Sequence, residues 1–124
     1  MTAKIFKIPI ISTMQVPKVF GTTADEIAEV YEKQYPEGVF RHEKVMFSML
    51  EDPVMLKLES HTPRNKIVLY GCEAHVCVKQ TCFELLEKNY DVTLVVDAIS
   101  SMGYHDRTVG IEAMRDAGAQ ITTF

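Results

Sequence analysis

The sequence predicts an α/β fold in which helices cover a mainly parallel sheet. Strand-like and helix-like segments alternate, the strand-like ones are apolar and rich in β-branched residues, and the connections are short. Parallel strands joined by helices favour right-handed crossovers. A length of 124 residues suits one small domain, which we expect to span residues 1–124.

The composition excludes several classes of protein. It is 47% hydrophobic and 24% charged, with a net charge of −4 and no long Lys/Arg run, so we expect no nucleic-acid partner. No apolar run approaches the roughly 20 residues of a membrane helix, so we expect no membrane partner. The three cysteines form a poor disulfide framework. No secretory signal is recognisable, because Lys4, Lys7 and Pro9 interrupt the apolar start, and we therefore expect a cytoplasmic location.

The first predicted strand covers residues 5–12, IFKIPIIS, with Pro9 placing it near an edge of the sheet. A helix should begin near Thr23 and Glu26, which have the spacing of a capping box. Its apolar stripe would contain Ile27, Val30 and Tyr31.

Residues 34–44, QYPEGVFRHEK, are predicted to form a loop because Pro36 and Gly38 favour turns. The pair Asp52 and Pro53 has the character of an N-cap followed by the first helical residue. A short helix to about Leu58 should follow.

The clearest strand is KIVLYGC, residues 66–72. A helix over residues 75–88 should follow, ending at a left-handed Asn89. The apolar side of this helix would contain Val76, Cys82, Phe83, Leu85 and Leu86.

Residues 91–100, DVTLVVDAIS, form the next predicted buried strand. Asp106 can cap a helix over residues 107–116, which Gly118 would end. The final segment, AQITTF, is predicted to be the last strand.

Cys77 falls about one turn into the helix that follows KIVLYGC. The carboxyl ends of the strands form the ligand crevice in open α/β sheets, and helix N-termini carry partial positive charge. A thiolate there is stabilised and is a better nucleophile, and free N–H groups of the same turn can hold an oxyanion. The junction could therefore supply both a nucleophile and its oxyanion stabiliser.

Structural burial is the alternative for each cysteine, since free cysteine is among the most buried residue types. Cys72 ends a strand and Cys82 lies on the apolar side of the helix, so both are assigned structural roles. A metal site is disfavoured because positions 77 and 82 lie about 140° apart around a helix. The remaining histidines, His42, His61 and His105, are placed in loops, and we expect no metal and no cofactor.

One long stretch, KIVLYGCEAHVCVKQTCFELLEKNYDVTLVVDAISS, resembles the core of the isochorismatase-like cysteine hydrolases, and most of all the eukaryotic isochorismatase domain-containing proteins. The stretches KIPIISTMQVPKVFG, EKVMFSML and HDRTVGIEAMRDAGAQITTF fit the same family in the same order. The resemblance implies a Rossmann-like three-layer α/β/α fold with a mainly parallel sheet.

The same resemblance implies a catalytic cysteine, lysine and aspartate. The cysteine falls on Cys77 and the lysine on Lys44, although by itself Lys44 would be assigned to the solvated surface. The resemblance also implies a cis peptide between Cys72 and Glu73, and a small-molecule substrate site that includes Cys72, Glu73 and Phe47. The aspartate would take the thiol proton, the thiolate would attack an amide-type carbonyl, and water would release the acid from a thioester.

The family aspartate ends a strand that precedes the equivalent of KIPIIST, and that strand and the following helix have no counterpart here. The family also continues beyond ITTF, so we expect an isochorismatase-like domain shortened at both ends. Such a chain could be a fragment or incorrect gene model, could pair with another copy, or could close into a smaller sheet. Met14 and Gln15 stand where relatives often have Glu-Gln. The carboxylates that could replace the aspartate are Glu51, Asp52, Glu73 and Asp97.

Three functional hypotheses follow. The first is a cysteine hydrolase that is weak or inactive because the aspartate is missing. The second is a non-catalytic binding or oligomerisation module, and a homo-oligomer is expected because the missing strand would expose apolar core. The third is a redox-sensing thiol at Cys77. The family acts on nicotinamide, carbamoyl compounds and vinyl ethers, and the sequence does not select among them.

Overall fold

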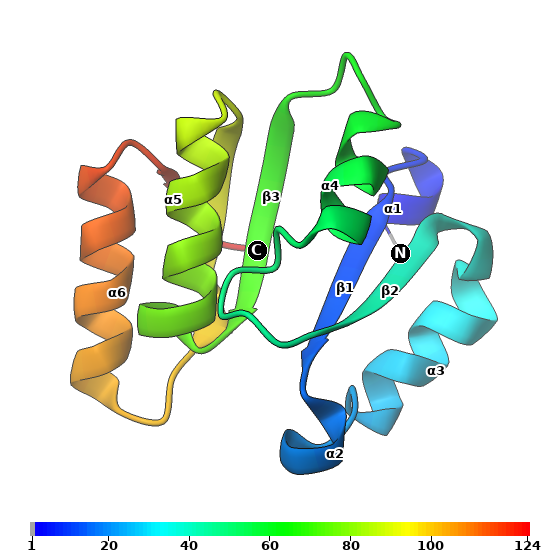
Figure 1. The fold of residues 1–124 in the computed structure, drawn as a ribbon, viewed down its shortest axis with the longest axis horizontal. Coiled ribbons are helices and arrows are strands. Elements are labelled where there is room, and N and C mark those ends of the chain that lie inside the picture. Colours follow the sequence, from blue (N-terminus) through cyan, green and yellow to red (C-terminus); the bar gives the residue numbers. More distant parts are fainter. Residues whose placement is uncertain (1) are drawn as a thin grey trace.

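The computed structural model describes residues 2–124 and arranges five strands in two parallel sheets (Figure 1). One sheet has the order β1–β2 and the other has the order β3–β4–β5. The strands are β1 (Ile10–Gln15), β2 (Val39–Lys44), β3 (Lys66–Cys72), β4 (Asp91–Ser100) and β5 (Gln120–Thr122). The helices are α1 (Thr2–Ile5), α2 (Pro17–Phe20), α3 (Asp25–Gln34), α4 (Asp52–Glu59), α5 (Lys79–Glu87) and α6 (Tyr104–Asp116).

Several predicted elements are confirmed. The strands predicted at 66–72 and 91–100 are β3 and β4, with the same bounds. The helix predicted at 75–88 is present as a π-helical turn, Ala74–Val78, that continues into α5. Asn89 is left-handed with φ of 63°, as predicted.

The first strand was placed too early. Residues 2–5 form the short helix α1, and β1 begins only at Ile10. Pro9 has no N–H to donate to a strand ladder, and the strand therefore starts after it.

The loop predicted at 34–44 is also wrong in its second half, which forms β2 after a 3₁₀ turn at Pro36–Gly38. His42, which was predicted to lie in a loop, therefore lies in strand β2. His105 was also predicted to lie in a loop and lies in helix α6. His61 lies in the turn after α4, as predicted.

None of the three predicted side-chain caps forms. The N-cap residues of α3, α4 and α6 are Ala24, Glu51 and Gly103, and no side chain makes a cap hydrogen bond at these ends. Thr23, Asp52 and Asp106 are therefore not the caps that their spacing suggested. Asp52 and Asp106 instead lie in the first turns of α4 and α6, where a carboxylate favours the positive end of the helix dipole.

Helices lie on both faces of the β1–β2 pair, as side-chain alternation along β2 shows. Arg41 points toward α3, where its guanidinium lies 5.6 Å from the ring centre of Tyr31. His42 and Lys44 point the other way, toward the start of α4 and the π turn. The β1–β2 sheet is therefore the middle layer of a three-layer α/β/α arrangement, as the resemblance implied.

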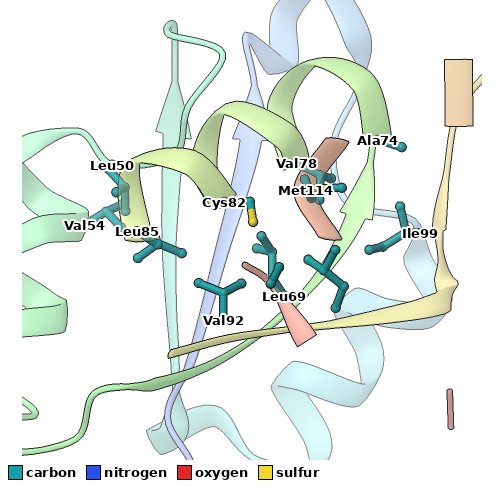
Figure 2. Packing of buried hydrophobic residues seen from close by; sticks show 12 residues of the cluster. Leu50, Val54, Leu69, Ala74, Val78, Cys82, Leu85, Val92, Ile99 and Met114 are labelled. Carbon is teal, nitrogen blue, oxygen red and sulfur yellow. The ribbon is translucent and has the colours of Figure 1, made fainter. Parts of the chain in front are cut away.

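The core lies between β3–β4 and helices α4, α5 and α6 (Figure 2). Its largest fully buried side chains are Leu85, Leu94, Met114, Val54 and Val92, and burial of each such side chain contributes about 1.5–3 kcal/mol. Cys82 is completely buried among them, as predicted. The opposite face of β3 differs from the prediction of a buried strand, because Val68 and Tyr70 are 59% and 51% exposed.

β1 and β3 each keep one edge without a strand partner among residues 2–124. β1 pairs in parallel with β2 alone, from Ile10 opposite Val39 to Gln15 opposite Lys44. The possibility that neighbouring strands close into one smaller sheet is thus not realised in this structure.

Candidate active site

The end of β3 turns sharply into the helix that carries Cys77. Gly71 has a φ of 131°, a conformation that side-chain-bearing residues rarely adopt. The next peptide, between Cys72 and Glu73, is cis, as the resemblance implied. The π turn begins at once, and the Val78 N–H donates to the carbonyl oxygen of Glu73 at 3.1 Å. Cys77 lies within this turn and is half-buried.

The π turn is tied to the segment that follows β4. The hydroxyl of Ser101 accepts the N–H of Ala74 at 3.0 Å and lies 3.2 Å from Nδ1 of His75. The carboxylate of Glu73 accepts the N–H of Met102 at 2.9 Å. Ser101 is absent from the residues predicted for the site. Its position directly after a strand could have indicated it, since the carboxyl ends of parallel strands meet at one edge of the sheet.

Helix α6 packs against the same turn at Gly110. A Cβ at this position would lie 2.8 Å from the backbone nitrogen of His75 and 2.9 Å from the carbonyl carbon of Ala74. Both atoms are backbone, so they cannot move aside as a flexible side chain does. Gly110 therefore permits the close approach that holds the turn in place.

Lys44 reaches the site from the end of β2. It is only 4% exposed, against the solvated role that the residue alone suggested. Its Nζ donates to the carbonyl oxygens of Met46 and Phe47, both at 2.9 Å, and to the side-chain oxygen of Gln15. The same Nζ lies 3.6 Å from Sγ of Cys77. Lys44 and Cys77, predicted from separate parts of the chain, are thus brought together.

An ammonium has three N–H donors and no acceptor. Four acceptors surround that of Lys44, namely three neutral oxygens and the sulfur. The sulfur is the only one of these that can carry a full negative charge. The arrangement therefore directs a positive charge at the thiol.

The carboxylates considered as replacements for the aspartate are engaged elsewhere. The Met46 N–H, the His42 side chain and the Val45 N–H, in that order, lower the pKa of Glu51 to about 2 by hydrogen bonding to its carboxylate. The Asp97 oxygens accept the N–H of Phe124 at 3.0 and 3.2 Å, in the middle of β4 and not at its end. Over residues 2–124, no carboxylate oxygen is a hydrogen-bond partner of the Cys77 sulfur.

The two other cysteines have less reactive environments. Partial burial, and then the neighbouring Glu73 and Cys77, raise the pKa of Cys72, although its side chain is exposed at the end of β3. Burial raises the pKa of Cys82 to about 11. The assignment of a structural role to Cys82 agrees with its position in the core.

The remaining predicted site residues lie around this pair. Cys72 and Glu73 form the cis junction just before the π turn, and Phe47 contributes its carbonyl to Lys44 while its side chain is 55% exposed. Within residues 2–124, no group of three or more His, Cys, Asp or Glu side chains is arranged to hold a metal ion. Two clefts, of about 430 and 510 Å³, lie along α3 and around His61 and are lined by other residues.

The isochorismatase domain profile matches residues 1–124. The chain belongs to the isochorismatase family. It is 40% identical over 122 residues to the secreted isochorismatase effector Isc1 of Phytophthora sojae, covering 98% of this chain and 57% of that protein. It is 39% identical over 121 residues to isochorismatase domain-containing protein 2 of Xenopus laevis, covering 98% and 56%.

Solved structures place the chain in the isochorismatase-like fold. A structure described as the MAR1 ribonuclease of Caenorhabditis elegans has a TM-score of 0.87 at 39% identity, covering 98% of this chain and 59% of that one. The nicotinamidase SaPncA of Staphylococcus aureus also gives 0.87, over 99% of this chain and 80% of that one, but at 14% identity this likeness concerns the fold alone. The isochorismatase chain described here thus spans little more than half the length of the curated relatives it matches. No helix in residues 2–124 has the length and apolar character to cross a membrane.

Proposed function

We propose that this isochorismatase-family chain carries a cysteine-hydrolase site that acts on a small amide-type substrate. The supporting observation is the 3.6 Å separation between Nζ of the buried Lys44 and Sγ of Cys77. A cation beside a thiol stabilises the thiolate, which is the nucleophilic form. The half-buried sulfur remains accessible to a small ligand at the carboxyl edge of the strands.

In the proposed reaction the Cys77 thiolate attacks the substrate carbonyl carbon and forms a carbon–sulfur bond. The carbon–nitrogen bond then breaks, the amine leaves with a proton taken from solvent water, and a thioester remains. Water attacks the thioester, which releases the acid and returns the thiol. The N–H groups of Ala74, Val76 and Val78 are already bonded and the backbone nitrogen of His75 is packed against Gly110, so an oxyanion would be held by the N–H of Cys77.

A base would speed two steps, removal of the thiol proton and activation of the attacking water. Residues 2–124 place no carboxylate at the sulfur to act as that base. Thiolate attack can proceed without such a base once the thiol is ionised, whereas hydrolysis of the thioester depends on activation of water. We therefore expect the 124-residue polypeptide, assayed alone, to be acylated at Cys77 faster than it turns over. Weak or absent steady-state hydrolysis is the expected result.

The test uses a small activated amide, such as an acyl p-nitroanilide, and intact-protein mass spectrometry. An acyl adduct on Cys77 with little continued release of p-nitroaniline is expected. Lys44→Met should slow adduct formation, whereas Lys66→Met, which alters a lysine side chain that is 81% exposed, should not. Acylation that survives Cys77→Ser, or that is equal in the two lysine variants, would contradict the proposal.

A different substrate class is suggested by the name of the C. elegans relative, which is described as a ribonuclease. The expectation of no nucleic-acid partner rests on the net charge of −4. Incubation with a labelled single-stranded RNA therefore belongs beside the amide assay. If the parent cleaves the RNA and Cys77→Ser does not, the substrate is a phosphodiester and not an amide.

A non-catalytic binding module is the second candidate, and the unpaired edges of β1 and β3 favour it. The exposed Val68 and Tyr70 lie on β3 beside one of these edges, and exposed apolar surface of this kind becomes an interface in oligomers. The expected partner is a second copy of the chain. Light scattering during size-exclusion chromatography tests this, and a monomer at all concentrations would exclude it.

The cytoplasmic location remains a prediction. The Phytophthora relative is named as a secreted effector, so secretion is the alternative to this prediction. Fractionation of cells expressing the tagged chain tests the prediction, and recovery from the medium would contradict it.

A further inference from the structure

The segment between β2 and α4, residues 45–51, wraps around the amine of Lys44. We call this segment the lysine loop. Its carbonyl groups at Met46 and Phe47 each accept a hydrogen bond from Nζ at 2.9 Å. These two oxygens, together with the side-chain oxygen of Gln15 on β1, fix where the amine lies, because the four-carbon stem of a lysine is flexible and does not fix its own end. The shape of the loop therefore decides whether the amine faces Cys77.

Glu51 closes the lysine loop onto its own beginning. Its Oε1 accepts the N–H groups of Val45 at 2.8 Å and Met46 at 2.9 Å. Its Oε2 lies 2.8 Å from Nε2 of His42, on the same face of β2 as Lys44. Hydrogen bonds to a carboxylate are about twice as strong as neutral ones, so this is the strongest tie within the loop.

Thr81 connects the lysine loop to the helix that follows Cys77. Its Oγ1 accepts the N–H of Met49 at 3.0 Å, and the residue is 2% exposed. Thr81 lies four residues after Cys77, which is about one helical turn. The loop is thus bonded at one end to the strand that carries the amine and in the middle to the helix that follows the sulfur.

We propose that Glu51 is a positioning residue, which together with Thr81 holds the lysine loop so that Lys44 faces Cys77. The peptide units involved make this coupling direct. Met46 donates its N–H to Glu51 and accepts Lys44 Nζ at its carbonyl, so loss of the carboxylate frees the residue that binds the amine. The consequence for catalysis rests on the function proposed above, whereas the effect on Lys44 itself does not.

Accessibility of the Lys44 amine gives a test that does not depend on the reactivity of Cys77. Trace acetylation with acetic anhydride, read by peptide mass spectrometry, compares Lys44 with the exposed Lys66 in the same sample. In the parent protein Lys44 should be strongly protected. Glu51→Ala should raise its relative labelling by about tenfold, as expected for the loss of charge-assisted hydrogen bonds.

Matched variants separate positioning from a general loss of structure. Glu51→Gln keeps a side-chain oxygen that can accept both N–H groups, so it should restore most of the protection. Thr81→Val removes the acceptor at nearly constant volume and should expose Lys44, whereas Thr81→Ser should not. Glu59→Ala, which removes an exposed carboxylate from α4, should leave the labelling unchanged.

The two proposals can fail separately. Equal protection of Lys44 in the parent and Glu51→Ala would overturn the positioning role, whatever Cys77 does. Equal exposure of Lys44 and of the core Cys82 in Glu51→Ala would show unfolding of the whole chain and would also overturn it. If Lys44 is released as expected but Cys77 in the parent is no more reactive than Cys72, the positioning role stands and the hydrolase function fails.

Discussion

Nζ of Lys44 lies 3.6 Å from Sγ of Cys77, although the two residues are 33 positions apart and the strands that lead to them, β2 and β3, belong to different sheets. The amine ends β2 and the sulfur lies in the turn after β3, so both occupy the carboxyl edge of parallel strands. No strand ladder joins the two sheets. The pair is held instead by side-chain and loop contacts.

The first prediction concerns removal of the amine. Lys44→Met should slow alkylation of Cys77 by iodoacetamide by about tenfold at about pH 6, since the neighbouring positive charge is lost. It should also lower the free energy of unfolding by about 1–3 kcal/mol, because buried oxygens lose their donor. Labelling kinetics and urea unfolding measure the two effects. Lys66→Met is the matched control. An equal change in Cys77 alkylation in both variants would count against the contact between Lys44 and Cys77.

The second prediction is an order of reactivity among the three thiols. Cys77 should be alkylated first and Cys72 second, because partial burial and nearby charges raise the pKa of Cys72. Cys82 should react only when the protein unfolds, since it is completely buried and its pKa is about 11. Peptide mass spectrometry at increasing times gives the order. Labelling of Cys82 in step with Cys77 under native conditions would contradict the packing of α5.

The third prediction concerns acid stability. Hydrogen bonds lower the pKa of Glu51 from 4.5 to about 2, so the folded state prefers the ionised carboxylate. The resulting stabilisation is fully present above about pH 4.5 and disappears as the pH falls toward about 2, because protonation then becomes possible in the folded state as well. Urea unfolding of the parent and of Glu51→Gln across this window tests it.

The parent should be the more stable protein at neutral pH, and its advantage over Glu51→Gln should shrink as the pH falls through this window. Other carboxylates titrate in both proteins and cancel in the difference. A difference that is constant with pH would show that the charge of Glu51 does not contribute.

The fourth prediction concerns the contact between α6 and the π turn. Gly110→Ala places a methyl group 2.8–2.9 Å from backbone atoms of Ala74 and His75, which real Cβ atoms do not tolerate. The helix or the turn must shift, and overpacking of this kind costs about 1–3 kcal/mol. Thermal unfolding measures the loss, and Cys77 alkylation measures the displacement of the turn. Ala113→Gly on the same helix is a comparison for helix propensity alone.

The parts of the fold that were predictable from the sequence are those with strong local signals. β3 and β4 each contain an apolar, β-branched run, and their bounds were predicted correctly. β2 was missed because polar residues run through its second half. Their partners lie nine positions away in the flanking segments, since Arg41 pairs with Glu32 at 3.3 Å and His42 with Glu51 at 2.8 Å. Such pairing has no periodic signature in the sequence.

The candidate site likewise contains residues that the sequence indicated and residues that it did not. Cys77 is indicated by its place at a strand-to-helix junction, whereas Lys44 was singled out only through the family resemblance. Glu51 was considered as a base, and the structure shows it bonded to its own loop instead. The contribution of Thr81 was not foreseen, because its bond to Met49 crosses 32 positions of the chain.

The separation of the strands into two sheets has a mechanical consequence. The boundary between the sheets passes between the amine and the sulfur, so a sliding motion of one half against the other changes their separation without breaking a single ladder hydrogen bond. The distance between the two atoms therefore depends on the few contacts that cross this boundary, such as the hydrogen bond from the Met49 N–H to Thr81.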